Sequence, residues 1–191
     1  LVRIKKSIEP GSDHYQTKGI PFVKVQDLSK FGLSEPSIFL SEREFKDTIT
    51  PKKDTILLSK DGSVGIAYKM SEAKNIITSS AILHLNIKDK NILPDYLTLV
   101  LNSIAVKMQA EKDAGGSIIN HWKISEIENV IIPIIEKEKQ EKISRLLIES
   151  ESLRNESKFI LDKAVRAVEI AIEDGEDKAT FFLQSNFNSP E

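Results

Sequence analysis

One uninterrupted stretch constrains this chain more than any other feature: residues 136–174 contain neither glycine nor proline. A continuous helix over these 39 residues would be about 58 Å long at 1.5 Å per residue. Within it, nine positions repeat at alternating spacings of three and four residues, the pattern of a helix that pairs with another helix. Two of the nine are Ser150 and Ser157, and the apolar ones are Ile143, Leu146, Leu153, Ile160, Ala164, Ala167 and Ala171.

A helix of this length exceeds what the rest of the chain can cover. The preceding segment of 135 residues would form a domain with a radius of gyration of roughly 14 Å. Packing of the helix on its own domain is therefore less favoured than pairing with a partner. We predict a long spacer or dimerisation helix over 136–174, a homodimer formed through it, and a flexible tail over 175–191.

Short strands separated by turns are predicted for the first 90 residues. Asp61-Gly62 is a strong hairpin signal between two of them. Ser41 and Glu44 form a capping-box pattern that predicts a short helix over residues 42–47. The strands are expected at residues 21–26, 55–59, 64–69 and 81–87.

Helical signals follow the strands. Pro94 is suited to the first position of a helix, and an amphipathic stripe continues from there to Met108. Ser125 and Glu128 suggest a second capping box, and the apolar residues 130–135 suggest an extended segment. We therefore predict an α+β fold, with a β-rich domain over residues 1–135 followed by the long coiled-coil-forming helix.

Composition excludes several classes of protein. The chain has no cysteine, so disulfides, thiolate zinc sites and cysteine nucleophiles are ruled out. No apolar run approaches the roughly 20 residues that a membrane helix needs. His14, His84 and His121 are far apart, and no phosphate-binding glycine pattern or nucleophile motif is present. We expect a cytoplasmic, non-catalytic protein with no metal and no cofactor.

Polar residues near glycine-containing turns are the remaining candidates for function. Lys60, Asp61 and Ser63 surround one such turn, and Ser117, Asn120 and Lys123 follow another. Glycine allows close backbone approach to a ligand, and lysine, serine and asparagine contact phosphates and base edges in nucleic-acid complexes. Exposed turns use the same residues for structural reasons, so these patterns alone indicate binding only weakly. With 27 Lys+Arg against 29 Asp+Glu, net charge gives no further support.

Residues 19–28 read GIPFVKVQDL and residues 55–65 read TILLSKDGSVG. The first segment resembles the G-I-P-F-I-R-x-x-D/N-L motif, and the second the D-I-L-x-S-x-x-G-x-x-G motif, of the target recognition domains of type I restriction–modification specificity subunits. Residues 93–97 resemble x-P-x-Y-L, and 116–118 resemble its G-S/T turn. Residues 130–134 with Gln140 and Ile143 resemble I-x-I-P-x-P-x-x-x-Q-x-x-I, although Ile135 replaces the second proline. Each motif is short, but five of them in the family's order over about residues 10–165 make the resemblance specific to this family.

The resemblance implies a division of labour. The β-rich domain would read one half of a split target in double-stranded DNA. The long helix would pair antiparallel with a counterpart and fix the half-site spacing. An adenine methyltransferase (modification) subunit and a restriction/translocase subunit would dock on this scaffold. The candidates for DNA contact are Lys24, Gln26, Lys60, Asp61, Ser63, Ser117, Asn120 and Lys123.

Alternatives stay open because full specificity subunits of this family carry two recognition domains and two spacer helices. This chain has room for one of each, so it resembles a half-subunit or one part of a longer chain. The second possibility includes the recognition region of a fused adenine methyltransferase or restriction endonuclease. A coiled-coil adaptor that binds only proteins is a third reading.

Overall fold

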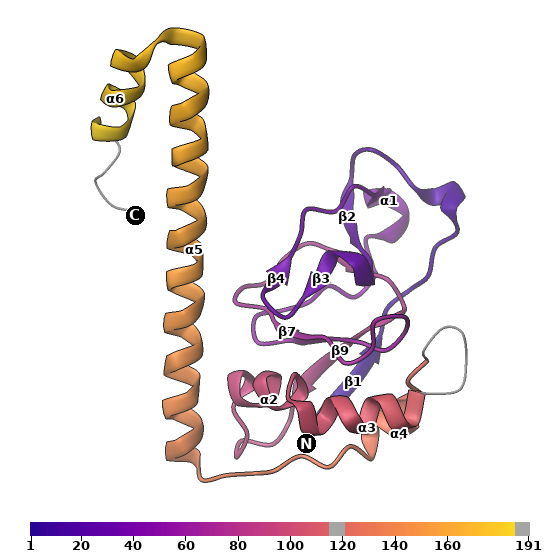
Figure 1. Cartoon of the computed structure of the whole chain (residues 1–191). Helices are drawn as coiled ribbons and strands as arrows, with labels where there is room; N and C mark the ends of the chain where they lie inside the picture. The colour runs from indigo at the N-terminus through magenta and orange to yellow at the C-terminus, as the bar shows by residue number, and fades with distance from the viewer. Residues whose placement is uncertain (115–120, 186–191) are drawn as a thin grey trace. The chain divides into compact units, whose positions relative to one another are not determined.

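A computed structural model describes residues 1–114 and 121–185. The chain divides into two compact units, Leu1–Ser144 and Arg145–Glu191, which we call the first and second units. The first contains every strand of the described residues, as the sequence predicted for a β-rich N-terminal domain (Figure 1). None of the described helices combines the length and the hydropathy needed to cross a lipid bilayer.

Within residues 1–114 and 121–185, nine short strands form three small sheets. The largest is fully antiparallel with the order β1-β9-β6-β7, the second has the order β5-β2-β8 with β2 and β8 parallel, and the third is the hairpin β3-β4. The strands are β1 (Val2–Lys6), β2 (Ile20–Val23), β3 (Leu28–Ser29), β4 (Gly32–Leu33), β5 (Phe39–Leu40), β6 (Ile56–Ser59), β7 (Ala67–Lys69), β8 (Ile77–Thr78) and β9 (Ile82–Ile87).

The helices are mostly short, except the one that the glycine- and proline-free stretch predicted. That helix, α5, spans 38 residues and confirms the expected long C-terminal helix. The helical elements are η1 (Ser12–His14), η2 (Val25–Asp27), α1 (Glu42–Phe45), α2 (Pro94–Leu101), α3 (Ile104–Ala114), α4 (Ile124–Glu128), α5 (Lys137–Asp174) and α6 (Glu176–Ser185). Pro94 is the first residue of α2, also as predicted.

The main core lies between the largest sheet and the helices α2, α3 and α4 (Figure 1). Strand β6 is buried along its whole length, because both of its neighbours in the sheet are strands and its residues are apolar up to Ser59. Trp122, which precedes α4, is completely buried in this core. Two smaller clusters fill the space around β2, β3 and β8. The sheet therefore gives the turns at its edges a rigid base.

The end of one predicted strand and the position of one predicted capping box were wrong. The strand predicted for residues 21–26 ends at Val23, because the backbone N–H of Lys24 donates to the Asp27 carboxylate (2.9 Å) and closes the turn η2. The box predicted for Ser125 and Glu128 lies two residues earlier: the backbone N–H of Lys123 donates to the Glu126 carboxylate (3.0 Å).

The amphipathic helix predicted from Pro94 to Met108 is broken at Asn102. This side chain donates to the backbone oxygens of Thr98 (2.9 Å) and Ala67 (2.7 Å), and it accepts from the Ala67 backbone N–H (3.1 Å). Asn102 thereby pairs with β7 and terminates α2. Beyond the break Met108 is exposed instead of continuing the buried stripe.

The beginning of α5 is anchored in the first unit by Gln140. This side chain is fully buried, and its amide nitrogen donates to the backbone oxygens of Asn91 (2.9 Å) and Ile135 (2.8 Å). Its oxygen accepts from the backbone N–H of Leu93 (3.0 Å). One amide therefore satisfies three backbone groups, a strong arrangement for a buried polar side chain.

The second unit contains the rest of α5 and the helix α6. In place of the flexible tail expected from residue 175, residues 176–185 form α6, which runs back beside α5 (Figure 1). Gly175 has a φ of 98°, a conformation that favours glycine at the end of a helix. Ala167 on α5 and Ala179 on α6 are both buried. Residues 186–191 lie outside the described residues.

Candidate nucleic-acid interface

The turn between β6 and β7 is held by one serine. The Ser59 hydroxyl donates to the backbone oxygen of Ser63 (2.5 Å) and accepts from the backbone N–H of Ile66 (2.9 Å). The backbone of Gly65 closes the turn by donating to the Ser59 oxygen (2.9 Å). Gly62 and Gly65 have φ values of 70° and 82°, which explains the glycines at both positions. Ser63 and Gly62 are exposed at the tip of this rigid turn.

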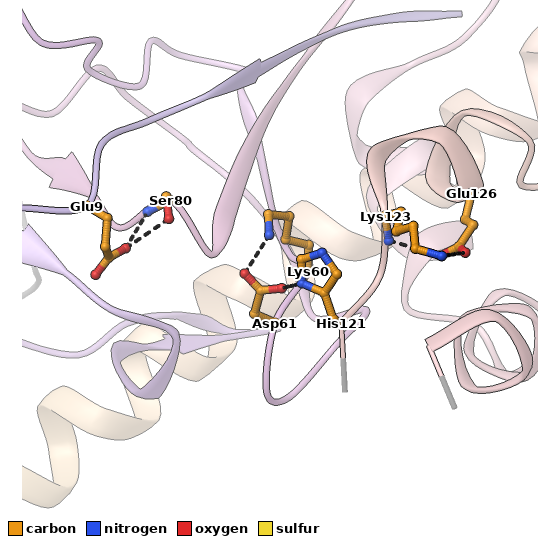
Figure 2. Close-up of polar contacts among 7 residues, drawn as sticks. All are labelled: Glu9, Lys60, Asp61, Ser80, His121, Lys123 and Glu126. Carbon is orange, nitrogen blue, oxygen red and sulfur yellow. Dashed lines mark hydrogen bonds and ion pairs between the residues drawn. The ribbon is translucent and has the colours of Figure 1, made fainter. Parts of the chain in front are cut away.

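At the base of the same turn, Lys60 and Asp61 form an ion pair. Lys60 is only 5% exposed, and its Nζ lies 2.5 Å from the Asp61 carboxylate. The other carboxylate oxygen of Asp61 contacts Nδ1 of His121 (Figure 2). The charge of Lys60 is thus matched by Asp61, so this lysine holds the turn in the structure and does not extend toward solvent.

The backbone joins the turn to the segment around Trp122. The Trp122 N–H donates to the Lys60 oxygen (2.8 Å), and the Lys60 N–H donates to the Ala81 oxygen (2.8 Å). Next to Trp122, Lys123 is exposed and its Nζ lies 3.1 Å from Glu126 (Figure 2). The pKa of Glu126 is lowered, chiefly because the Lys123 backbone N–H donates to its carboxylate.

On the other side of the turn lies the β3-β4 hairpin. A groove of about 660 Å³ separates the two, and its walls include Phe31 of the hairpin and Ser63 of the turn. We use the name three-segment surface for the hairpin residues 28–33, the turn residues 60–65 and residues 121–123. The fold brings these segments together although they are separated by up to 95 residues in the chain.

The remaining predicted contact residues lie at different places. Gln26 is exposed on the turn η2, which leads directly into the hairpin. Lys24 is half-buried, and its Nζ lies 5.0 Å from the centre of the Tyr15 ring. Ser117 and Asn120 are outside the described residues. The Glu9 carboxylate accepts two hydrogen bonds from Ser80, one from the backbone N–H and one from the hydroxyl, each 3.0 Å long (Figure 2). They fix the segment around Glu9 to the loop after β8.

Sequence reasoning missed His121 as a partner of Asp61 and missed the hairpin. The histidine carried no local signal, because its partner lies 60 residues away. The sequence signal for the hairpin was Phe31, an aromatic residue that is exposed at the hairpin tip and is followed by a glycine.

The described titratable groups include one buried histidine. Among residues 1–114 and 121–185, no three His, Asp or Glu side chains are grouped so that they could hold a metal ion. His84 is buried in β9 and contacts the Thr78 hydroxyl (2.9 Å). Burial, with a contribution from the charge of Lys5, lowers the pKa of His84 to about 4. This histidine is therefore neutral near pH 7 and belongs to the core, away from the three-segment surface.

Three solved structures similar to this chain come from studies of type I restriction-modification systems. The S subunit of a type I restriction-modification system from M. genitalium has a TM-score of 0.66 at 20% identity, over 90% of this chain and 42% of that one. The HsdS subunit from Thermoanaerobacter tengcongensis has a TM-score of 0.57 at 18% identity, over 96% of this chain and 40% of that one. A chain from a study of complex assembly and conformational transition of the type I R-M system has a TM-score of 0.59 at 18% identity, with coverages of 93% and 43%.

These likenesses confirm the predicted fold, and the chain spans about two fifths of the length of each of these structures. None of the curated proteins compared matches the sequence. The model of the type I restriction modification DNA specificity domain matches residues 2–158, which is most of the chain. The chain therefore belongs to the family of type I restriction modification DNA specificity domains, as its motifs had suggested.

Proposed function

We propose that this chain reads one half of a bipartite double-stranded DNA target for a type I restriction–modification complex. The match to a DNA specificity domain over residues 2–158 is the observation that carries the proposal. The three-segment surface supports it, because polar turns on a rigid sheet are suited to contacting base edges and phosphates. The first unit is the reader, and catalysis belongs to other subunits.

The contact residues in this proposal are those that the sequence singled out. Ser63, Gln26 and Lys123 are exposed around the three-segment surface, and Asp61 is half-buried beside them. Lys60 acts mainly by holding the turn, because its Nζ is paired with Asp61. Lys24, with Ser117 and Asn120 beyond the described residues, completes the proposed set.

We further propose that α5 pairs with the same helix of a second copy and acts as the spacer between half-sites. Leu146, Leu153 and Ile160 are 65%, 59% and 57% exposed in the second unit, in the middle of the predicted seam. Ile143 packs against the main core and Ala167 is buried in the second unit, so these two positions of the seam are already covered within the chain. Ala164 and Ala171 extend the seam toward α6.

In this proposal the chain acts as a half-sized specificity subunit, and the recognition region of a fused methyltransferase or endonuclease is the alternative. A chain with one reader and one helix needs a second copy to read both halves of a target. The methyltransferase and restriction subunits would bind to the paired helices, and the methyltransferase would supply much of the phosphate contact that this chain, with a net charge of −2, lacks. All of these subunits act in the cytoplasm.

Binding to a library of random duplexes tests this proposal, with the chain alone and with the modification subunit of its own system. Enrichment of a defined sequence supports DNA recognition. A library that stays unenriched in both conditions contradicts it and leaves the protein-only adaptor as the better reading.

A further inference from the structure

The β3-β4 hairpin presents a fixed tip of two residues, Lys30 and Phe31. The Ser29 hydroxyl donates to the Gly32 backbone oxygen (2.9 Å) and accepts from the Phe31 backbone N–H (3.2 Å). Gly32 has a φ of 148°, in the region that favours glycine. Both strands are therefore tied together directly beneath the tip.

Packing beneath the hairpin fixes it to the sheet. Leu28 is buried and belongs to the same core cluster as Leu57 of β6 and Met70, and Leu33 packs against this cluster. The Ser34 backbone N–H donates to the Asp27 oxygen (2.9 Å), which closes the two ends of the hairpin. A short two-stranded ribbon on a buried base is a rigid projection, and it costs little conformational entropy when it meets a ligand.

The tip combines an apolar ring with a cation. Phe31 is 53% exposed, and the Nζ of Lys30 lies 4.8 Å from the centre of its ring. A single exposed apolar side chain is common on protein surfaces and by itself means little. The location is what distinguishes Phe31: it lines the groove of about 660 Å³ that also includes Ser63 of the β6-β7 turn.

Charge around the groove adds a second observation. Lys60 is neutralised by Asp61, so the turn itself presents no free lysine. The cations at the groove are Lys30 on the hairpin and Lys107 on α3. The Nζ of Lys107 lies 3.7 Å from the Glu111 carboxylate, so this lysine already has a charge partner. Lys30 is therefore the residue placed to contact a phosphate next to the ring of Phe31.

We propose that the β3-β4 hairpin enters the major groove of the DNA target, where Phe31 contacts the methyl group of a thymine and Lys30 contacts a neighbouring phosphate. The inference rests on the proposed function and extends it to a segment outside the predicted contact set. The major groove admits a two-stranded β-ribbon, and the thymine methyl is the apolar group that a phenylalanine can read there. Phe31 is then a specificity-determining residue, and Lys30 contributes affinity without sequence preference.

The test compares variants on the duplex that the wild-type full chain selects from a random library. Phe31→Ala is expected to lower affinity roughly four- to tenfold, the effect of one buried methyl contact. Substituting deoxyuridine for the contacted thymidine removes only the methyl group, so it should weaken the wild type and leave Phe31→Ala unchanged. Lys30→Ala should weaken binding to all duplexes equally and reduce the salt dependence by about one counterion.

Matched controls are Phe181→Ala on α6, where the side chain is 71% exposed, and Lys90→Ala, an exposed lysine outside the groove. Both should bind like the wild type. Equal loss from the methyl deletion in the wild type and in Phe31→Ala would overturn the inference while leaving DNA recognition intact. A wild-type chain that selects no sequence would instead overturn the proposed function, and the hairpin's role with it.

Discussion

The two units differ in how they bury apolar surface. Among the described residues, every fully buried aromatic or aliphatic side chain larger than alanine lies in the first unit, in three clusters around the sheets. Over residues 145–185 of the second unit, only Ala167 and Ala179 are buried, while Leu153 and Ile160 among others remain exposed. A long helix gains most of its stability from tertiary packing of an apolar face. The comparison teaches that the first unit buries its large apolar side chains within the chain, whereas many apolar side chains of the second unit stay exposed.

Truncations of leucine in each unit would test this difference most strongly. Leu58→Ala in β6 should lower the free energy of unfolding of the first unit by about 2–5 kcal/mol, because it leaves a cavity at a fully buried site. Leu153→Ala should change that free energy by less than about 0.5 kcal/mol, because its side chain is 59% exposed in the second unit. Chemical denaturation followed by the fluorescence of the buried Trp122 measures both. Equal losses would show that the units do not differ as described.

Acid should affect the first unit through His84. Its pKa is about 4 in the folded protein against 6.5 for the unperturbed side chain, so between these values the unfolded state binds more protons. The contribution of His84 to the free energy of unfolding is therefore constant above pH 6.5. As the pH is lowered toward 4, protonation of His84 in the unfolded state reduces this free energy by up to about 3 kcal/mol. His84→Gln should remove this component of the pH dependence in stability curves. A wild-type curve parallel to that of the variant would contradict the buried neutral histidine.

Gln140 lies where α5 begins, and its loss should loosen that end of the helix. Gln140→Ala leaves three partly buried backbone groups without this side-chain partner, which should cost about 1–3 kcal/mol. Amide hydrogen exchange should accelerate in the first turns of α5 and at Leu93. Gln109→Ala is the matched control: Gln109 also bridges backbone groups, of Ile131, but at an exposed site, so a smaller effect is expected. An equal effect of the two substitutions would argue against Gln140 as the anchor.

Charge placed on the seam should separate two copies without unfolding the reader. The chain mass is 21.5 kDa, so light scattering of a dimer should give about 43 kDa, twice this value. Leu153→Asp with Ile160→Asp should return the mass to that of one chain, because buried unpaired carboxylates oppose helix pairing. The circular dichroism of the first unit should not change. A wild-type monomer would show that the exposed seam needs a different partner helix.

The smallest expected effect concerns the ion pair at Lys123. This lysine is exposed, and its contact with Glu126 has the modest value of a surface pair. Lys123→Ala should therefore leave the thermal midpoint of the first unit nearly unchanged, while DNA affinity should fall and its salt dependence decrease if the proposed phosphate contact forms. Unchanged affinity at every salt concentration would remove Lys123 from the contact set.

Elements whose cause lies in neighbouring residues could be predicted from the sequence, whereas elements set by contacts between distant residues could not. The buried strand β6, the start of α2 at Pro94 and the length of α5 follow from hydrophobic runs and from the positions of proline and glycine. The break at Asn102 could not be predicted, because it arises from hydrogen bonds to Ala67, which is distant in sequence. α6 was missed because Gly175 and the polar residues that follow it were interpreted as the start of a flexible tail.

The same distinction applies to the candidate interface. The β6-β7 turn was visible as a glycine pattern, and its residues are indeed exposed at the tip. The pairing of Lys60 with Asp61 and of Asp61 with His121 was not, since charge partners depend on the folded geometry. Consequently the sequence treated Lys60 as a direct contact, whereas its burial points to a supporting role.

The central claim is that the first unit reads a sequence and the second sets a spacing, and one selection experiment tests both. The wild-type chain, with the modification subunit of its own system, is used to select from duplexes of random sequence. Two identical readers paired through antiparallel helices should enrich an inverted repeat of one half-site at a single fixed spacing. Selected duplexes without a shared half-site, or with half-sites at many spacings, would contradict the account.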